Sequence, residues 1–156
     1  MALNIVLFQP EIPPNTGNIA RTCAVTGVHL HLIKPLGFSI DQKSVKRAGL
    51  DYWDQLELTI HENFDAFLEH LDGGNMWFAS TKGGHLYSDV QYQDNDFIVF
   101  GQESKGLPPA FYERYADQLI RIPMKPVEGA RSLNLSNAAA VLIYEALRQT
   151  GFDHLI

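Results

Sequence analysis

The chain has 156 residues, 46% of them hydrophobic and 19% charged, which fits one ordinary globular domain and excludes an intrinsically disordered chain. The single cysteine, Cys23, excludes an internal disulfide framework and a multi-cysteine metal site. The longest apolar run, residues 138–144, is far shorter than the roughly 20 residues that a membrane-spanning helix needs. The first residues lack the basic region of a secretory signal, so we expect a cytoplasmic protein with no membrane partner.

The net charge of −6 is spread unevenly along the chain. Residues 1–50 carry a charge of +3, residues 51–100 carry −9, and the remainder is neutral. Phosphate contacts depend on local charge, because salt screens charges over about 10 Å. The acidic total therefore does not exclude an RNA partner.

Apolar runs alternate with amphipathic stretches from one end to the other, which predicts one α/β domain over residues 1–156. In chain order we expect a strand at 3–8, a helix at 16–26 capped by Asn15 or Thr16, a strand at 30–33, a helix at 41–48, a strand at 56–60, a helix at 63–71, strands at 76–80 and 96–100, a helix at 108–115, a strand at 118–122 and a helix at 137–150. This order favours a mainly parallel sheet with helices on both faces. The ligand site of such a sheet lies beyond the carboxyl ends of its strands, here after residues 8, 80, 100 and 122.

The loop after the first predicted strand is rich in polar groups close to a helix start. It reads Gln9-Pro10-Glu11-Ile12-Pro13-Pro14-Asn15-Thr16-Gly17-Asn18-Ile19-Ala20-Arg21. Free backbone N–H groups at a helix start favour an anion, and Arg21 follows Asn15 by about one and a half turns. A capped loop with a solvent-exposed arginine explains the same residues equally well.

The loop after residue 100 holds a carboxylate between two glycines: Gly101-Gln102-Glu103-Ser104-Lys105-Gly106-Leu107-Pro108. Leu107 and Pro108 stand where a P-loop needs lysine and a hydroxyl, so a P-loop NTPase is excluded. Glycine lets a backbone approach a ligand closely, and it serves ordinary turns as often.

A third polar segment precedes the last predicted helix. Ile122-Pro123-Met124 is followed by Glu128-Gly129-Ala130-Arg131-Ser132-Leu133-Asn134-Leu135-Ser136-Asn137. One residue, Ser136 or Asn137, would suffice to cap the helix. The surplus of small polar residues indicates a further role.

Two other groups of residues bear on the partner and the metal content. Lys43, Lys46 and Arg47 share one face of the predicted 41–48 helix, which fits a solvated face or contact with a phosphate backbone. The six histidines show no metal-binding spacing, so we predict surface or core roles for them and no metal. Cys23 has apolar neighbours, which favours the core over a nucleophile.

Taken together, the loops resemble the motifs of the SPOUT superfamily of RNA methyltransferases, in its TrmH-like branch and its minimal single-domain type. The matching stretches run in family order over nearly the whole chain: residues 11–19 with Arg21; Arg47-Ala48-Gly49-Leu50-Asp51-Tyr52; Phe100-Gly101 with Glu103 and Gly106-Leu107-Pro108; and Ile122-Pro123-Met124 with Arg131-Ser132 and Asn134-Leu135-Ser136-Asn137. The resemblance implies a C-terminal deep trefoil knot, an obligate homodimer and S-adenosylmethionine bound by the knot loops. It places the cofactor pocket at Ala79, Gly101, Glu103, Ile122, Met124, Ser132 and Leu133.

By the same resemblance, Arg21 orients the ribose 2′-hydroxyl and stabilises the developing alkoxide, while Asn15, Ser132 and Asn134 shape the catalytic site. The implied reaction transfers a methyl group from S-adenosylmethionine to the wobble ribose, of cytidine or uridine, in the tRNA anticodon. Two alternatives stay open: methylation of ribosomal RNA, and a knotted RNA-binding protein that has lost catalysis. Because the minimal chain has no appended RNA-binding domain, we expect Lys43, Lys46 and Arg47 to contact the RNA.

Overall fold

The computed structural model describes residues 2–40, 50–129 and 132–156. The predicted helix at 41–48 and the three basic residues on it lie outside these ranges. The elements in chain order are β1 (Leu3–Phe8), α1 (Pro13–Thr26), β2 (His29–Ile33), the 3₁₀ helix η1 (Leu50–Gln55), β3 (Leu58–His61), α3 (Phe64–Leu68), β4 (Met76–Ala79), β5 (His85–Leu86), β6 (Asp96–Phe100), α4 (Pro109–Arg114), the 3₁₀ helix η2 (Ala116–Gln118), β7 (Leu119–Arg121) and α5 (Leu135–Thr150).

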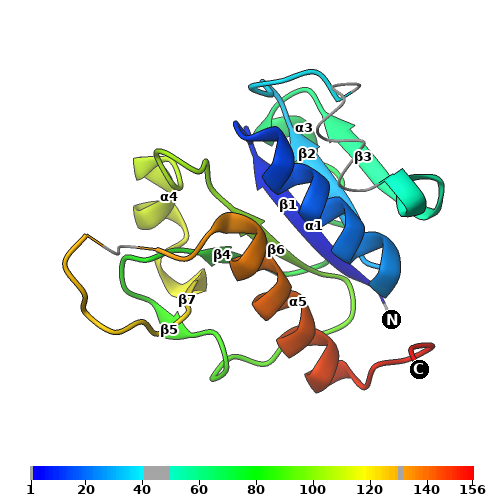
Figure 1. Ribbon diagram of the computed structural model, residues 1–156. Helices are drawn as coiled ribbons and strands as arrows, with labels where there is room; N and C mark the ends of the chain where they lie inside the picture. The colour runs from blue at the N-terminus through cyan, green and yellow to red at the C-terminus, as the bar shows by residue number, and fades with distance from the viewer. Residues whose placement is uncertain (1, 41–49, 130–131) are drawn as a thin grey trace.

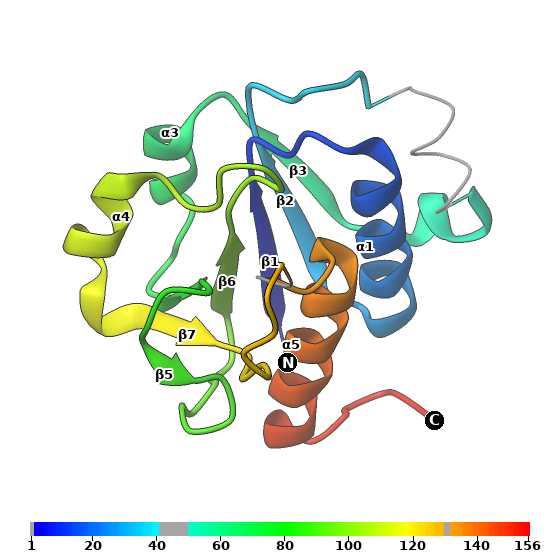
Figure 2. The same cartoon turned by 60° about the vertical axis from the view of Figure 1, so that its left-hand side comes forward.

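The strands form one seven-stranded sheet in the order β3-β2-β1-β6-β4-β7-β5, and every pair of neighbours is parallel. Helices α1 and α5 lie side by side on one face, while α3 and α4 lie toward the other (Figures 1 and 2). The predicted α/β class with helices on both faces is confirmed. The C-terminal trefoil knot stays a prediction.

Side chains of the central strands point alternately to the two faces of the sheet and contribute to a hydrophobic core on each face. Leu3, Ile5 and Leu7 of β1 pack toward α1 and α5, whereas Val6 joins the second core with Phe67 and Phe97. Strands covered on both faces bury nearly every side chain, which is why β1 and β6 are apolar except for Asn4 and Asp96. Burial of each such side chain stabilises the fold by roughly 1.5–3 kcal/mol.

The start of α1 differs from the prediction. The helix begins at Pro13, and its N-cap is Ile12 rather than Asn15 or Thr16. Proline fits the first helical positions because its fixed φ suits a helix and its missing N–H is not needed there. The predicted ends are confirmed at Gly27 and Gly151, both in the left-handed conformation.

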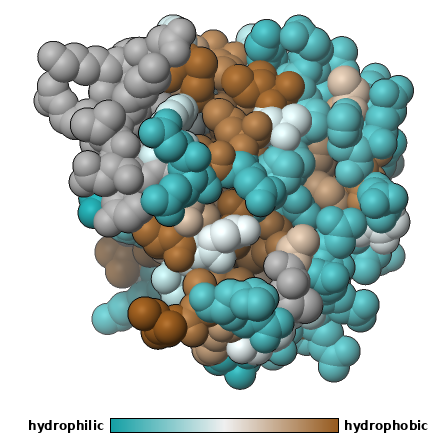
Figure 3. Space-filling model, turned by 90° about the vertical axis from the view of Figure 1, so that its right-hand side faces the viewer, coloured by the Kyte–Doolittle hydropathy of each residue, from teal (hydrophilic) through white to brown (hydrophobic). Residues whose placement is uncertain are grey.

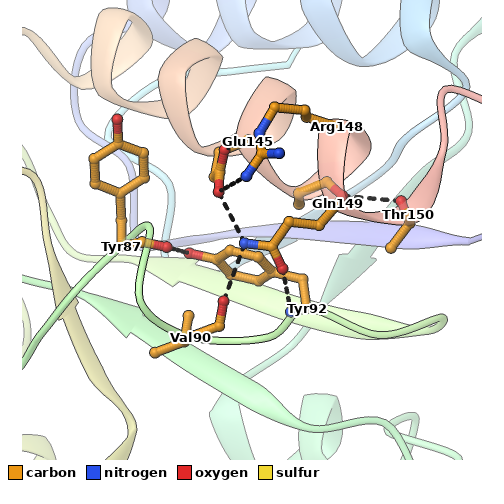
Figure 4. Close-up of polar contacts among 8 residues, drawn as sticks. Tyr87, Val90, Tyr92, Glu145, Arg148, Gln149 and Thr150 are labelled. Atoms are coloured by element: carbon orange, nitrogen blue, oxygen red, sulfur yellow. Dashed lines mark hydrogen bonds and ion pairs between the residues drawn. The ribbon is translucent and has the colours of Figure 1, made fainter.

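The second half of α5 is fastened to the segment that joins β5 and β6 (Figure 4). The Gln149 amide donates to the Val90 carbonyl and accepts from the Tyr92 backbone N–H, both at 3.0 Å. The Tyr92 hydroxyl in turn donates to the Tyr87 carbonyl at 2.6 Å. Glu145 holds the same amide and, through two hydrogen bonds, Arg148. These bonds fix the helix whose N-terminal end meets the third predicted loop.

A chain of hydrogen bonds through His31 occupies the other face of the sheet. His31 Nδ1 is 2.9 Å from His61 Nε2, and His31 Nε2 is 3.0 Å from Asn4 Oδ1. The Asn4 amide nitrogen donates to Asn95 and to the Asp96 carbonyl, so its oxygen must accept from His31 Nε2–H. In a neutral His31, Nδ1 is then an acceptor, and His61 Nε2–H donates to it. This arrangement needs a neutral His31.

Aromatic rings enclose these histidines. His29 stacks on His31 with ring centroids 4.1 Å apart, and Phe67 and Phe97 present rings at 5.9 and 5.5 Å. Burial, followed by the neighbouring histidines, lowers the pKa of His31 to about 3. Burial also lowers the pKa values of His29 and His61. Both His31 and His61 are buried, in line with the core role that the sequence predicts for some of the histidines.

Candidate functional site

The three polar loops of the sequence analysis meet around one pocket of about 600 Å³ at the carboxyl ends of β4, β6 and β7. All seven predicted cofactor residues line it, together with Asn15, Ser132 and Asn134. The pocket also borders buried apolar side chains of α5 and the sheet, including Leu142 and Ile120. A mixture of apolar walls and a few convergent polar groups is typical of a small-molecule site.

Glu103 ties the second loop to the first. Its Oε1 accepts the backbone N–H of Glu11 at 3.0 Å, and its Oε2 accepts that of Ile12 at 2.7 Å. The Asn15 amide donates to the same Oε2 at 3.4 Å. Ile12 has no side chain that can cap α1, so the Glu103 carboxylate, from the loop after β6, supplies the acceptors at this helix start. Both oxygens of Glu103 are thus engaged by the first loop.

Asn134 ties the third loop to the first. Its amide nitrogen donates to Asn15 Oδ1 at 3.1 Å. Its Oδ1 accepts from the backbone N–H groups of Ser136 and Asn137, so Asn134 is the N-cap of α5 in place of the predicted Ser136 or Asn137. Asn134 adopts an extended backbone, which is the conformation that an N-cap requires. One side chain therefore starts the helix and joins two loops.

A tight turn between two glycines shapes the pocket wall formed by the second loop. Gln102 and Gly106 exchange backbone hydrogen bonds of 3.0 and 2.8 Å, which closes a tight turn. A Cβ on Gly101 would lie 2.1 Å from the carbonyl carbon of Gly106. Gly106 has a φ of +69°, a conformation that favours glycine. Gly101 must therefore be glycine for the turn to close beside the pocket.

Among the pocket-lining residues that the sequence-based prediction did not assign are Ser80, Lys82 and Tyr112. The Ser80 hydroxyl donates to Tyr112 at 3.1 Å and accepts from the Lys82 backbone N–H at 2.9 Å, while Lys82 Nζ lies 5.5 Å from the Tyr112 ring. Ser80 directly follows β4, so its position at a strand's carboxyl end was the signal available. Tyr112 sits on a helix away from any motif and carried no such signal.

Arg21 is placed apart from the other predicted catalytic residues. It lies on α1 with an exposed side chain and does not line the pocket of its own chain. Lys43, Lys46 and Arg47 lie outside the described residues. Cys23 is fully buried, and burial raises the pKa of its thiol to about 12, which agrees with the predicted core role.

Comparison with known proteins adds to this geometry. The model of the SpoU rRNA methylase family matches residues 2–144. The chain belongs to this family. A tRNA (cytidine(34)-2′-O)-methyltransferase of Escherichia coli strain K12 is 51% identical over 151 residues, covering 96% of this chain and 95% of that protein. A protein of the same name from Saccharophagus degradans is 52% identical over 150 residues, covering 96% of each.

Solved structures of the family share the fold over nearly the whole chain. One that concerns 2′-hydroxyl methylation of C/U34 on tRNA has a TM-score of 0.89 and 46% identity, and the match covers 96% of each chain. The SpoU methyltransferase AviRb of Streptomyces viridochromogenes, solved with S-adenosylmethionine, has a TM-score of 0.79 at 24% identity over 94% of this chain and 57% of that one. At this identity the second likeness concerns the fold.

Proposed function

We propose that this chain transfers a methyl group from S-adenosylmethionine to the ribose 2′-hydroxyl of the wobble nucleotide, a cytidine or uridine, in the tRNA anticodon. The observation that carries the proposal is the convergence of the three family loops on one pocket through Glu103, Asn15 and Asn134. Whole-length relatives that bear the name of this activity support it.

The pocket suits the proposed cofactor. Its volume lies within the range of small-molecule sites, and Gly101 lets the turn of residues 101–106 close tightly at the pocket wall, since a Cβ there would meet the Gly106 backbone. Ala79, Gly101, Glu103, Ile122, Met124, Ser132 and Leu133 would hold the cofactor. When bound, S-adenosylmethionine supplies an activated methyl group on its sulfonium. The protein then contributes mainly alignment, which is worth on the order of 7 kcal/mol or more.

The residues of the chain have separate proposed tasks. Asn15, Ser132 and Asn134 position the ribose at the pocket, where Asn15 is itself fixed by Glu103 and Asn134. Arg21 orients the 2′-hydroxyl and stabilises the charge that develops on its oxygen. A guanidinium offers N–H donors and no acceptor, so we assign Arg21 no role as the proton acceptor.

Arg21 is exposed and does not line the pocket of its own chain, which fits a homodimer in which the exposed side of α1 faces a second copy. Val25 on α1 and Val141 and Tyr144 on α5 are 46, 37 and 47% exposed, and the two helices are adjacent. Apolar side chains also gather on the side of the molecule seen in Figure 3. Sedimentation should give a dimer, and Tyr144→Glu should give monomers with reduced methyl transfer. A monomeric wild-type chain with full activity would refute this arrangement.

RNA contact is assigned to Lys43, Lys46 and Arg47, as the charge of residues 1–50 suggests. Reversing Lys46 and Arg47 to glutamate should weaken tRNA binding and reduce its salt dependence. Lys34→Glu is the matched control, because Lys34 already pairs with Glu62 at 3.1 Å. Unchanged affinity and salt slope in the double variant would remove these residues from the interface. No helix in the described ranges could span a membrane, and we propose that the protein acts in the cytoplasm.

The test of the proposed function is methyl transfer from labelled cofactor to an anticodon stem-loop, with the product mapped by mass spectrometry. A stem-loop with 2′-deoxycytidine at the wobble position is the matched control and should accept no label. Because the family description names rRNA, ribosomal RNA forms a second arm. Label on rRNA alone would favour that alternative, and RNA binding without transfer would favour the non-catalytic one.

A further inference from the structure

Glu11 takes part in an exchange of hydrogen bonds between the first and second loops. Glu11 Oε1 accepts from the Ser104 backbone N–H at 3.0 Å and from the Ser104 hydroxyl at 2.7 Å. In the opposite direction, the neighbouring Glu103 accepts from the backbone N–H groups of Glu11 and Ile12. Two adjacent residues of each loop thus bind two adjacent residues of the other, across more than 90 positions of sequence.

We propose that Glu11 is a positioning residue of the methyl-transfer site, one half of a reciprocal latch formed by Glu11, Ile12, Glu103 and Ser104. The latch holds the loop of residues 101–106, which lines the cofactor pocket, against the start of α1 in the ligand-free protein. This inference rests on the proposed function, since it concerns how the same pocket is kept ready for its cofactor.

The first and second loops are joined mainly by hydrogen bonds. Ile12 is 44% exposed, and Ser104 and Lys105 are exposed as well, so little apolar burial joins the loops here. Two further side-chain hydrogen bonds link these loops in the described residues: the Asn15 amide to Glu103 Oε2 at 3.4 Å, and Gln102 Nε2 to the Gln9 carbonyl at 3.1 Å. The hydrogen bonds from Ser104, and the charge of Lys105, lower the pKa of Glu11, so its carboxylate is ionised at neutral pH. Bonds to an ionised acceptor are about twice as strong as neutral ones.

The two carboxylates of the latch differ in a way that a single substitution exposes. Glu11 accepts both of its bonds on one oxygen, so glutamine can still accept both. Glu103 uses both oxygens, so glutamine there would turn an amide N–H₂ toward a backbone N–H. The latch should therefore keep its hydrogen bonds in Glu11→Gln and lose them in Glu103→Gln. If Glu11 acted through its negative charge, Glu11→Gln would also be impaired.

The test measures the affinity for S-adenosylmethionine by calorimetry and the exchange of the Ser104 amide proton in the ligand-free protein. Glu11→Ala should weaken binding about tenfold or more and speed exchange at Ser104, because two charge-assisted bonds are lost. Glu11→Gln should stay within about threefold of wild type. Ser104→Ala should fall between them and add nothing in the Glu11→Ala background. Glu62→Ala, which removes a surface ion pair near β3, is the control and should match wild type.

Wild-type affinity and exchange in Glu11→Ala, or equal losses in Glu11→Ala and Glu11→Gln, would overturn the latch. Should Glu11→Ala fail to fold, the comparison of Ser104→Ala with Glu11→Gln replaces it. Of these two variants, Ser104→Ala should bind S-adenosylmethionine more weakly. A wild-type protein that does not bind S-adenosylmethionine would refute the proposed function instead. In that case, hydrogen exchange of the Ser104 amide still tests the latch, because the measurement needs no ligand.

Discussion

Two polar networks of the molecule differ in their surroundings. The network of Asn4, His31 and His61 links neighbouring strands, and phenyl rings close over it. The network of Glu103, Asn15 and Asn134 links three segments far apart in sequence and borders an open pocket. The side chains of Asn4, His31 and His61 are buried, whereas Glu103 is half-buried and Asn134 is exposed, so burial of polar groups does not mark the site. The site is marked instead by hydrogen-bonded polar groups that lie next to a cavity.

Glu103→Gln should produce the largest effect and confine it to the pocket. An amide opposite the Ile12 N–H leaves a donor unpaired at the helix start, a loss of roughly 3 kcal/mol, or about 100-fold in kcat/KM for methyl transfer. Steady-state kinetics with labelled cofactor measure it, and Glu62→Gln is the surface control. A variant within threefold of wild type would mean that the loops are held by something else.

Acid should act on the histidine network instead. Because the pKa of His31 in the folded protein lies below its unfolded value, its stabilising effect is complete above about pH 6.5 and is lost as pH falls toward 3. The free energy of unfolding should drop by roughly 2 kcal/mol between pH 7 and pH 5, since each pKa unit is worth about 1.4 kcal/mol. Urea titrations at several pH values measure this drop.

The control for the acid effect is His31→Gln, which should flatten part of the pH dependence and leave the remainder to His29 and His61. Glu57 faces His29, and Asn4, His70, Phe67 and Phe97 complete the surroundings of the network. An identical pH profile in wild type and His31→Gln would contradict the assignment of a neutral buried His31.

Asn134→Asp separates the two tasks of one side chain. Aspartate keeps the Oδ1 that caps α5 but replaces the donor to Asn15 with an acceptor. Thermal stability should change little, while methyl transfer should fall about tenfold, as expected for a broken link of about 1.4 kcal/mol. Asn134→Ala should lower both the melting temperature and the rate. Equal melting temperatures in the two variants would show that the cap is unimportant.

Tyr112→Phe should produce the smallest effect. It removes the partner of the Ser80 hydroxyl but keeps the ring under Lys82, and Ser80 stays fixed by the Lys82 backbone N–H. Loss of one neutral hydrogen bond of about 1 kcal/mol predicts a fall in cofactor affinity of roughly fivefold at most. Calorimetry checks it, and a loss beyond about 20-fold would place Tyr112 among the residues that contact the cofactor directly.

The sequence predicted the elements that have strong local patterns. The strands at residues 3–8 and 96–100 are found with the predicted bounds, since strands buried on both faces are mainly apolar. β5, two residues long, has no pattern of its own and pairs with β7 only through the tertiary fold. The start of α1 was misplaced because its acceptor comes from Glu103, far away in sequence.

For the site, the family resemblance supplied the pocket residues, and composition supplied the three loops. The contact of Glu11 with Ser104 could not be predicted from local sequence, because the two residues are 93 positions apart. For Arg21, the sequence predicted the helix but not the position relative to the pocket. Its sequence position gives its helix, while its distance from the pocket of its own chain depends on the fold.

Hydrogen exchange of the backbone with and without S-adenosylmethionine is the most direct test of three loops forming one pocket. The account predicts that the cofactor slows exchange together in residues 79–82, 101–107, 122–124 and 132–135, and leaves the histidine network of β2 and β3 unchanged. Protection of one of these segments without the others, or protection centred on β2 and β3, would contradict it.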